Sequence, residues 1–186
     1  DFAVFRTAVQ EGGKVKGICA PGCANYSRRQ LDELAELAKA YGAKGLITLA
    51  LKENAANLAV DTGRSVAAKF LTSKQTREIA TRLGAKGGDL LLIVAGKPGV
   101  VDKALEQIRQ EMGQRLGLID PNLLAFVFIV GYPLFEWNEE ERRWEPMHHP
   151  FTAPKEEDIP LLETAPEKVR SRHYDIVCNG CELSSG

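Results

Sequence analysis

The residues best suited to chemistry gather in the string CNGCELSSG at positions 178–186. Cys178 and Cys181 are spaced as C-x-x-C, a pattern that binds zinc or cycles a disulfide. Asn179-Gly180 between them indicates a hairpin, because a type I′ turn needs positive φ at both central positions and these two residues tolerate it best. The turn predicts that Cys178 faces Cys181 across two antiparallel strands.

The same register predicts three further facing pairs: Val177 with Glu182, Ile176 with Leu183, and Asp175 with Ser184. Side chains alternate along a strand, so one face should hold Ile176, Cys178, Cys181 and Leu183, and the other Asp175, Val177, Glu182 and Ser184. Asp175 and Glu182 then become diagonal neighbours, roughly 7–8 Å apart at the backbone. Two carboxylates at that spacing can converge on one hard cation.

The cysteines share their face with apolar residues, which favours packing in a core. A closed zinc site needs four ligands, and Cys19, Cys23 and the histidines lie in other segments. Redox C-x-x-C pairs begin a helix rather than bracket a hairpin turn. A zinc-binding interaction module therefore stays open as an alternative, while four cysteines in 186 residues do not indicate a disulfide scaffold.

A second candidate is the adjacent pair His148 and His149 in MHHPFTAP. Neighbouring residues on a strand point to opposite faces, so at most one of them serves a given site and the other supports it from behind. No Ser or Cys nucleophile elbow lies nearby, and no catalytic residue is assigned. Spacing alone favours a structural role for the pair.

The sequence divides into two expected units, and the second contains the histidine pair and the CNGC hairpin. In residues 1–122, strands are expected at 15–20, 45–51 and 88–96. Helices are expected at 28–41 behind a Ser27/Gln30 capping box, at 74–83 capped by Ser73, and at 98–116 opened by Pro98. The pattern predicts an α+β fold with helices long enough to cover one face of the sheet, so this unit should be a compact sandwich of sheet and helices.

Residues 123–186 form the second expected unit. The apolar run at 123–130 predicts a central strand covered on both faces. Trp137 and Trp144 flank an acidic turn in a predicted hairpin, residues 154–172 indicate a loop or surface helix, and the CNGC hairpin closes the chain.

Charge divides between the units. Residues 1–122 carry 18 Lys+Arg against 13 Asp+Glu, whereas residues 123–186 carry 6 against 12. Four basic residues lie near the first strand and helix: Lys14, Lys16, Arg28 and Arg29. They motivate an RNA-contact hypothesis, against the plainer interpretation of a solvated surface. No apolar run is long enough to span a membrane and no signal peptide pattern is present, so we expect no membrane and a cytoplasmic location.

The string YPLFEWNEEERRWEPMHHPFTAP, followed by YDIVCNGCELSSG, closely resembles the catalytic domain of bacterial-type aspartyl-tRNA synthetases, which are class II enzymes. Upstream strings resemble the inserted, GAD-type domain of those enzymes, shared with the B subunit of the tRNA-dependent amidotransferase: FAVFRTAV, APGCANYSRRQLDELAELAKAYGAKGL, AKFL and GDLLLIVAGKPGVVDKALEQIRQEMGQRLGLID. The resemblance implies an inserted domain at 1–122, followed at 123–186 by antiparallel strands of a class II catalytic sheet.

The resemblance further implies an ATP- and Mg²⁺-dependent ligase that forms aspartyl-adenylate and transfers aspartate to tRNA(Asp), with tRNA(Asn) left open and a homodimeric parent enzyme. It places aspartate near His148, His149 and Ser185, ATP near Glu182, and Mg²⁺ near Asp175 and Glu182. Because no covalent enzyme intermediate is needed, positioning and charge neutralisation would supply the catalysis.

Three features depart from the family. Gly131-Tyr132 replaces an acidic residue and Phe, ELSSG replaces a glycine-richer run, and Cys181 stands where the family has an aromatic or aliphatic residue. The arginines that neutralise charge in class II enzymes have no counterpart here. We therefore expect the chain to be a fragment that cannot form the adenylate alone, and we leave open whether the inserted domain contacts RNA or is architectural.

Overall fold

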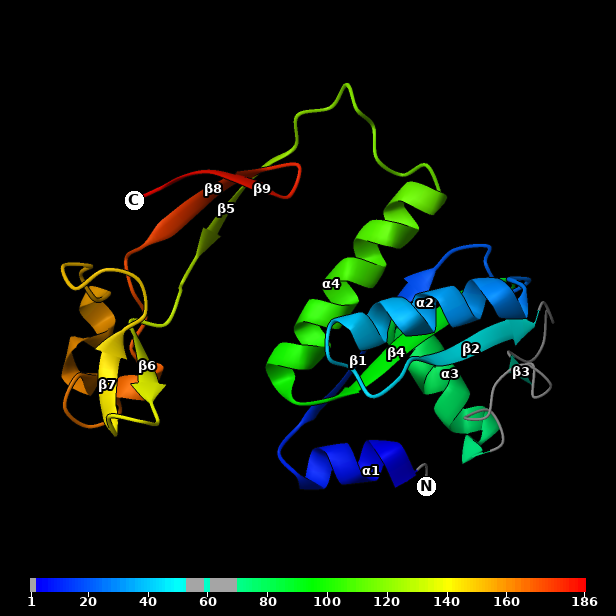
Figure 1. Cartoon of the computed structure of the whole chain (residues 1–186), viewed down its shortest axis with the longest axis horizontal. Coiled ribbons are helices and arrows are strands. Elements are labelled where there is room, and N and C mark those ends of the chain that lie inside the picture. The colour runs from blue at the N-terminus through cyan, green and yellow to red at the C-terminus, as the bar shows by residue number, and fades with distance from the viewer. Residues whose placement is uncertain (1–2, 53–58, 61–69) are drawn as a thin grey trace. The chain divides into compact units, whose positions relative to one another are not determined.

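The computed structural model describes residues 3–52, 59–60 and 70–186 (Figure 1). The chain divides into two compact units, residues 1–119 and 120–186, which are described separately. Phe2 of FAVFRTAV and residues 68–69 of AKFL lie outside the described residues. No helix in the described ranges is long and apolar enough to cross a membrane.

The first unit is built on a four-stranded antiparallel sheet in the order β1-β4-β2-β3. Its strands are β1 (Lys14–Ala20), β2 (Ile47–Lys52), β3 (Ala59–Val60) and β4 (Leu90–Gly96). The central strand β4 begins LLLIV, and all five of these side chains are buried. A continuous apolar run is expected where a strand is covered on both faces.

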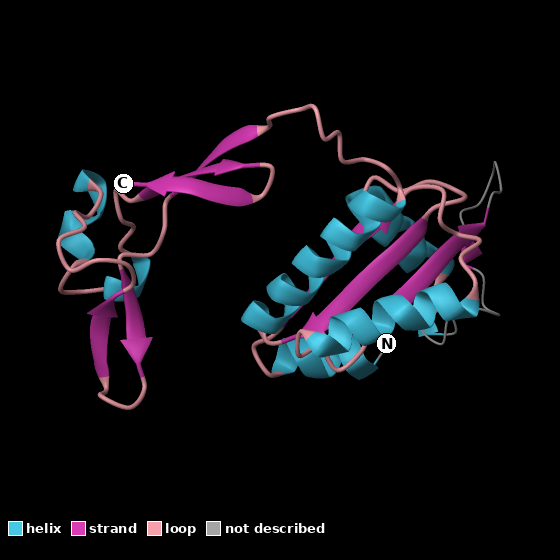
Figure 2. Ribbon diagram, turned by 45° about the horizontal axis from the view of Figure 1, so that its top comes forward, coloured by secondary structure: helices cyan, strands magenta, loops and turns pink. Residues whose placement is uncertain are grey.

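Helices cover both faces of this sheet (Figure 2). On one face α2 (Arg28–Ala40) and α4 (Pro98–Arg115) pack Leu34 and Ile108 against Leu92. On the other, α1 (Ala3–Gln10) and α3 (Ser73–Arg82) pack against Leu91 and its neighbours. The predicted sandwich of sheet and helices is confirmed, although helices cover two faces of the sheet where one was expected, and α1 was not among the predicted helices.

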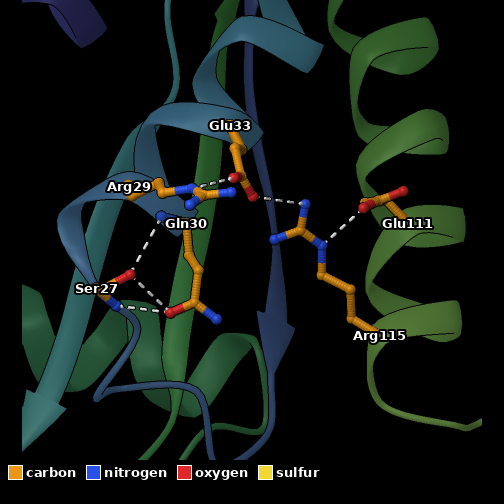
Figure 3. A network of polar contacts seen from close by, with 6 residues as sticks. All are labelled: Ser27, Arg29, Gln30, Glu33, Glu111 and Arg115. Carbon is orange, nitrogen blue, oxygen red and sulfur yellow. Dashed lines mark hydrogen bonds and ion pairs between the residues drawn. The ribbon is translucent and has the colours of Figure 1, made fainter.

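Capping boxes begin two of these helices. Ser27 accepts from the backbone N–H of Gln30, whose side chain accepts in return from the N–H of Ser27, as predicted (Figure 3). The predicted cap Ser73 is wrong: Thr72 caps α3, because Gln75 stands three residues after Thr72 and completes the reciprocal pair.

An ion-pair network joins α2 to α4. Arg115 of α4 bonds Glu111 at 2.7 Å and reaches Glu33 of α2 at 3.4 Å (Figure 3). Glu33 also pairs with Arg29 at 3.0 Å. These partly exposed pairs add little free energy each, about 0–1 kcal/mol, so the apolar layer beneath them holds the helices together.

The second unit contains a three-stranded antiparallel sheet in the order β5-β8-β9 and a separate hairpin, β6-β7. The strands are β5 (Phe126–Val130), β6 (Phe135–Asn138), β7 (Arg143–Pro146), β8 (Tyr174–Cys178) and β9 (Cys181–Ser185). The β6-β7 hairpin forms as predicted, and within it Trp137 faces Trp144. Short 3-10 turns at Glu156–Leu161 and Pro166–Lys168 occupy the expected loop.

The prediction of a covered central strand at 123–130 is wrong for this chain. Among the described strands β5 pairs with β8 alone and is therefore an edge strand, and all its side chains are exposed, from 38% for Ile129 to 64% for Val130. In the described part of the second unit no long helix packs on this sheet, unlike the sheet of the first unit.

The loop before β8 is fixed by one buried carboxylate. Asp158 accepts from Nε and Nη2 of Arg170 at 2.7 and 2.9 Å and from the Arg170 backbone N–H at 2.9 Å. Beside it, the backbone N–H of Ser171 donates to the carbonyl of Tyr132 at 2.7 Å. The segment that enters β8 is thereby held against the segment that follows β5.

Candidate functional site

The terminal hairpin begins as predicted and then changes register. Asn179 and Gly180 have φ of 50° and 85°, as a type I′ turn requires. The predicted pairs Cys178 with Cys181 and Val177 with Glu182 are present. A bulge between Ile176 and Val177 then makes Ile176 face Ser184 and Asp175 face Ser185, so the other two predicted pairs are wrong by one residue.

The bulge decides which side chains share a face. One extra residue on β9 restores Ser185 to the side of Glu182, because a bulge offsets the alternation of side chains. Asp175, Glu182 and Ser185 therefore lie on the same face of the sheet, whereas an unbroken ladder would have turned Ser185 away. All three of these residues were predicted to bind substrates or metal.

The cysteine-bearing face of the hairpin was predicted to pack in a core, and this prediction holds only in part. Cys178 is buried, but Cys181 is exposed and Leu183 is 60% exposed. Within the described residues, no group of three or more His, Cys, Asp or Glu could hold a metal ion. The zinc alternative thus has two facing thiols and no further ligand in the described part of the chain.

Asp175 is the centre of a polar cluster. The hydroxyl of Tyr132 donates to its Oδ2 at 2.5 Å, and Nε2 of His173 lies 2.9 Å from its Oδ1. The hydrogen bond to Asp175, together with partial burial and the charges of Asp175 and Glu182, raises the pKa of Tyr132 to about 12. Tyr132 therefore stays protonated and acts as a fixed donor at neutral pH.

His148 joins this cluster by ring packing. Its imidazole stacks on that of His173 with centroids 4.2 Å apart, and it meets Tyr132 edge to face at 4.9 Å. His149 instead packs on Phe151, with ring centroids 3.6 Å apart. The two adjacent histidines have separate surroundings, and only His148 lies with Tyr132, His173 and Asp175, here called the Asp175 cluster.

Two members of the cluster were missed as site residues. His173 stands two positions before Asp175, and residues at that spacing share a face of an extended segment, so the sequence did hold a signal for it. Tyr132 carries no such signal. Its place depends on the contacts between the segment after β5 and residues 170–171, which join positions far apart in the chain.

The Asp175 cluster offers one carboxylate, two imidazoles and a phenol, and Glu182 and Ser185 share the sheet face of Asp175. It can orient a polar substrate through hydrogen bonds. Asp175 accepts two hydrogen bonds and still has free lone pairs, since a carboxylate has about four acceptor positions. Mg²⁺ bound with a nucleotide takes one or two protein carboxylates and completes its shell with phosphate oxygens and water, so Asp175 and Glu182 fit it.

The basic residues expected to form a cluster in the first unit are partly neutralised. Lys16 bonds Asp102 of α4 at 2.5 Å, and Arg29 pairs with Glu33. Lys14 and Arg28 make no ion pair in the described part of the chain. The positive surface near β1 and α2 is therefore weaker than residue counts indicate.

Comparison with known proteins gives two results. The profile of the GAD domain family matches residues 5–105. Over its whole length the chain is 48% identical to an aspartate–tRNA(Asp/Asn) ligase of Dehalococcoides mccartyi strain CBDB1 and 50% identical to one of Thermoanaerobacter sp. strain X514. The chain spans 31% and 30% of those proteins, less than a third of their length.

Proposed function

The chain belongs to the GAD domain family, and from this membership and its relatives we propose that it is part of an aspartate–tRNA ligase. Residues 1–122 form the inserted domain, and residues 123–186 form part of the catalytic domain. Aspartate, ATP and tRNA(Asp) are the substrates, and the names of the relatives support tRNA(Asn) as a second acceptor. The parent enzyme is a cytoplasmic homodimer.

In the proposed reaction the carboxylate of aspartate attacks the α-phosphate of ATP and displaces pyrophosphate. The activated acyl group then passes from the adenylate to a hydroxyl at the 3′ end of the tRNA, and AMP leaves. No protein nucleophile takes part, so this chain contributes orientation and electrostatics. This assignment is consistent with the Asp175 cluster, which contains hydrogen-bonding groups and no Ser, Cys or Lys.

Each predicted residue has a defined task. His148 contacts the bound aspartate, and its stacking on His173 fixes the plane of the ring. Ser185, on the same face as Asp175, borders the amino-acid pocket, and His149 supports His148 from its contact with Phe151. Glu182 contacts ATP.

Asp175 and Glu182 would also hold Mg²⁺ on the phosphates, and the ion would neutralise phosphate charge when bound. Tyr132 keeps Asp175 in one orientation for this task. The residues of this chain that are proposed to contact ATP and its metal ion are carboxylates, and none of them is an arginine that could neutralise phosphate charge. We therefore expect the isolated 186-residue chain to give no adenylate formation above background.

One observation carries the proposal. The bulge at Ile176/Val177 places Asp175, Glu182 and Ser185 on one face, and His173 links Asp175 to His148. Except for His149, the residues that the family resemblance assigns to aspartate, ATP and metal are thus neighbours, although they come from three separate segments of the chain.

A domain exchange tests the proposal. This chain replaces the matching 31% of the Dehalococcoides mccartyi ligase, and the hybrid is assayed for aspartate-dependent ATP–pyrophosphate exchange and for charging of tRNA. We expect exchange well above that of the isolated chain. A hybrid that is folded and dimeric but gives no exchange contradicts the proposal.

Substitutions in the hybrid then test the residues. Glu182→Gln and His148→Ala should each lower the exchange rate by about 100-fold, the usual effect of losing one transition-state contact. Glu163→Gln removes an exposed carboxylate elsewhere in the second unit and is the matched control. Equal rates for Glu182→Gln and Glu163→Gln would remove Glu182 from the ATP site.

A further inference from the structure

A cleft of about 630 Å³ opens in the first unit at one end of the four-stranded sheet. It is bordered by α1, by the segment that enters β2, by the end of β4 and by the start of α4. Its volume lies within the range of about 300–1,000 Å³ in which proteins bind small molecules. The residues proposed for aspartate and ATP all lie in the second unit, so they leave this cleft without a task.

The cleft has a mainly apolar lining with two polar side chains beside it. The apolar side chains come from four elements or their borders: Val4, Ala8, Leu46, Ile47, Ala95 and Val100. Thr7 and Glu11 line it from α1 and the turn that follows. An apolar surface with a few hydrogen-bonding groups suits a flat ring with polar edges.

Two ammonium groups flank this surface from different parts of the chain. Lys44 precedes β2 and Lys97 follows β4, and both are exposed and line the cleft. Neither ammonium group has an ion pair or hydrogen bond in the described part of the chain, whereas that of Lys16 is paired with Asp102. The first turn of α4, directly after Lys97, contains no acidic residue, and Glu11, which lines the same cleft, forms no ion pair with either lysine in the described part of the chain.

The ligand that complements this cleft has an apolar, ring-shaped body and a negative group. We propose that the cleft binds a nucleoside phosphate, with the base on the apolar lining and the phosphate between Lys44 and Lys97. Thr7 and Glu11 then accept hydrogen bonds from the amino or hydroxyl groups of the base or ribose. The choice of a nucleotide over other apolar anions rests on the proposed function, whose substrates are ATP and an RNA.

The nucleoside phosphate is either a free mononucleotide or one nucleotide of an RNA strand. Calorimetric titration of the whole 186-residue chain at low salt without Mg²⁺ separates them. The ligands are AMP, ribose 5-phosphate, hexanoate and a short single-stranded RNA. AMP should bind at least about tenfold more tightly than ribose 5-phosphate, because only AMP covers the apolar lining.

Substitutions locate the binding. Lys44→Ala and Lys97→Ala should each weaken AMP binding by about fivefold or more through loss of a charge-assisted contact. Thr7→Phe, at an exposed position of α1, should fill the cleft and abolish binding. Lys103→Ala, on the exposed side of α4, and Glu182→Gln, in the second unit, should leave AMP affinity unchanged.

Three outcomes would overturn the inference. The first is no AMP binding at millimolar concentration, and the second is hexanoate binding as tightly as AMP. The third is that Glu182→Gln loses AMP binding while Lys44→Ala keeps the native affinity. Tighter binding of RNA than of AMP assigns the site to a strand, and equal binding assigns it to a free nucleotide. These titrations require no catalysis. Absence of AMP binding would therefore not contradict the ligase proposal, and an inactive hybrid would not contradict AMP binding in the cleft.

Discussion

Tyr132 and Asp175 stand 43 positions apart in the sequence and meet through a hydrogen bond of 2.5 Å from the phenol to the carboxylate. This contact fixes Asp175 from the side of the segment after β5, and His173 fixes its other oxygen. A carboxylate held at both oxygens loses rotational freedom before any ligand arrives. Such preorganisation is what a positioning site requires.

The first prediction concerns the phenol itself. Asp175→Asn should lower the pKa of Tyr132 from about 12 toward its ordinary value near 10, because the hydrogen bond to Asp175 is the largest cause of the increase. The measurement is the tyrosinate absorbance between pH 10 and 11. Subtracting the titration of Tyr132→Phe isolates this residue from the other tyrosines. An unchanged difference titration in Asp175→Asn would show that the carboxylate is not its partner in solution.

The second prediction is a pH dependence at the Asp158–Arg170 pair. The Arg170 side chain and backbone N–H lower the pKa of Asp158 to about 2, below the ordinary 3.8 that applies in the unfolded chain. Its ionised form therefore stabilises the fold above about pH 4, and this contribution is lost as the pH falls toward 2. Asp158→Asn should lower the Tm at pH 7, and the difference from the native chain should vanish near pH 2.

Tryptophan fluorescence is the suitable signal, because both tryptophans, Trp137 and Trp144, lie in the second unit with Asp158. Glu163→Gln is the control, as an exposed carboxylate in the same loop. A Tm difference between Asp158→Asn and the native chain that persists at pH 2 would contradict the role of the charge.

The third prediction separates the two tasks of Asn179. Its side chain accepts from the Ala125 N–H at 2.9 Å and donates to the Leu123 carbonyl at 2.9 Å, and its backbone has φ of 50°. Asn179→Gly keeps the turn and loses two hydrogen bonds, which should reduce the free energy of unfolding by about 1–2 kcal/mol. Asn179→Ala should cost about 1 kcal/mol more, because alanine resists the left-handed region.

Urea denaturation followed by tryptophan fluorescence measures both variants. Equal stability of Asn179→Gly and the native chain would show that the link from the turn to residues 123–125 adds nothing. Equal stability of the Gly and Ala variants would show that the positive φ is not retained.

The fourth prediction ranks the thiols. Burial, the negative charge of Asp89 and a hydrogen bond to Asp89 together raise the pKa of Cys19 to about 11. Burial also raises the pKa of Cys23. Since Cys178 is buried and Cys181 is exposed, iodoacetamide at pH 8 should modify Cys181 first. Peptide mass spectrometry identifies the site. Early modification of Cys178 would show that this thiol is exposed to solvent, in contrast to its buried position in the structure.

Patterns within one segment were predicted well because local rules govern them. The Ser27/Gln30 box, the helix opened by Pro98 and the type I′ turn each depend on residues a few positions apart. The cap predicted at Ser73 is wrong by one residue, since its neighbour Thr72 is the residue with a glutamine, Gln75, three positions later. The helix α1 was missed, and the apolar run at 123–130 was predicted as a covered strand, whereas the strand is Phe126–Val130 and is exposed.

The sequence by itself determined the two units, the hairpin turn and the identity of the residues that resemble a synthetase site. Only the tertiary structure decided that a bulge brings Ser185 to the face of Asp175 and Glu182, and that Tyr132 and His173 hold Asp175. A bulge follows from how a whole strand fits its partner, and the Tyr132 contact depends on pairing across 43 positions. Neither is encoded in the spacing of nearby residues, because both arise from packing between segments distant in the chain.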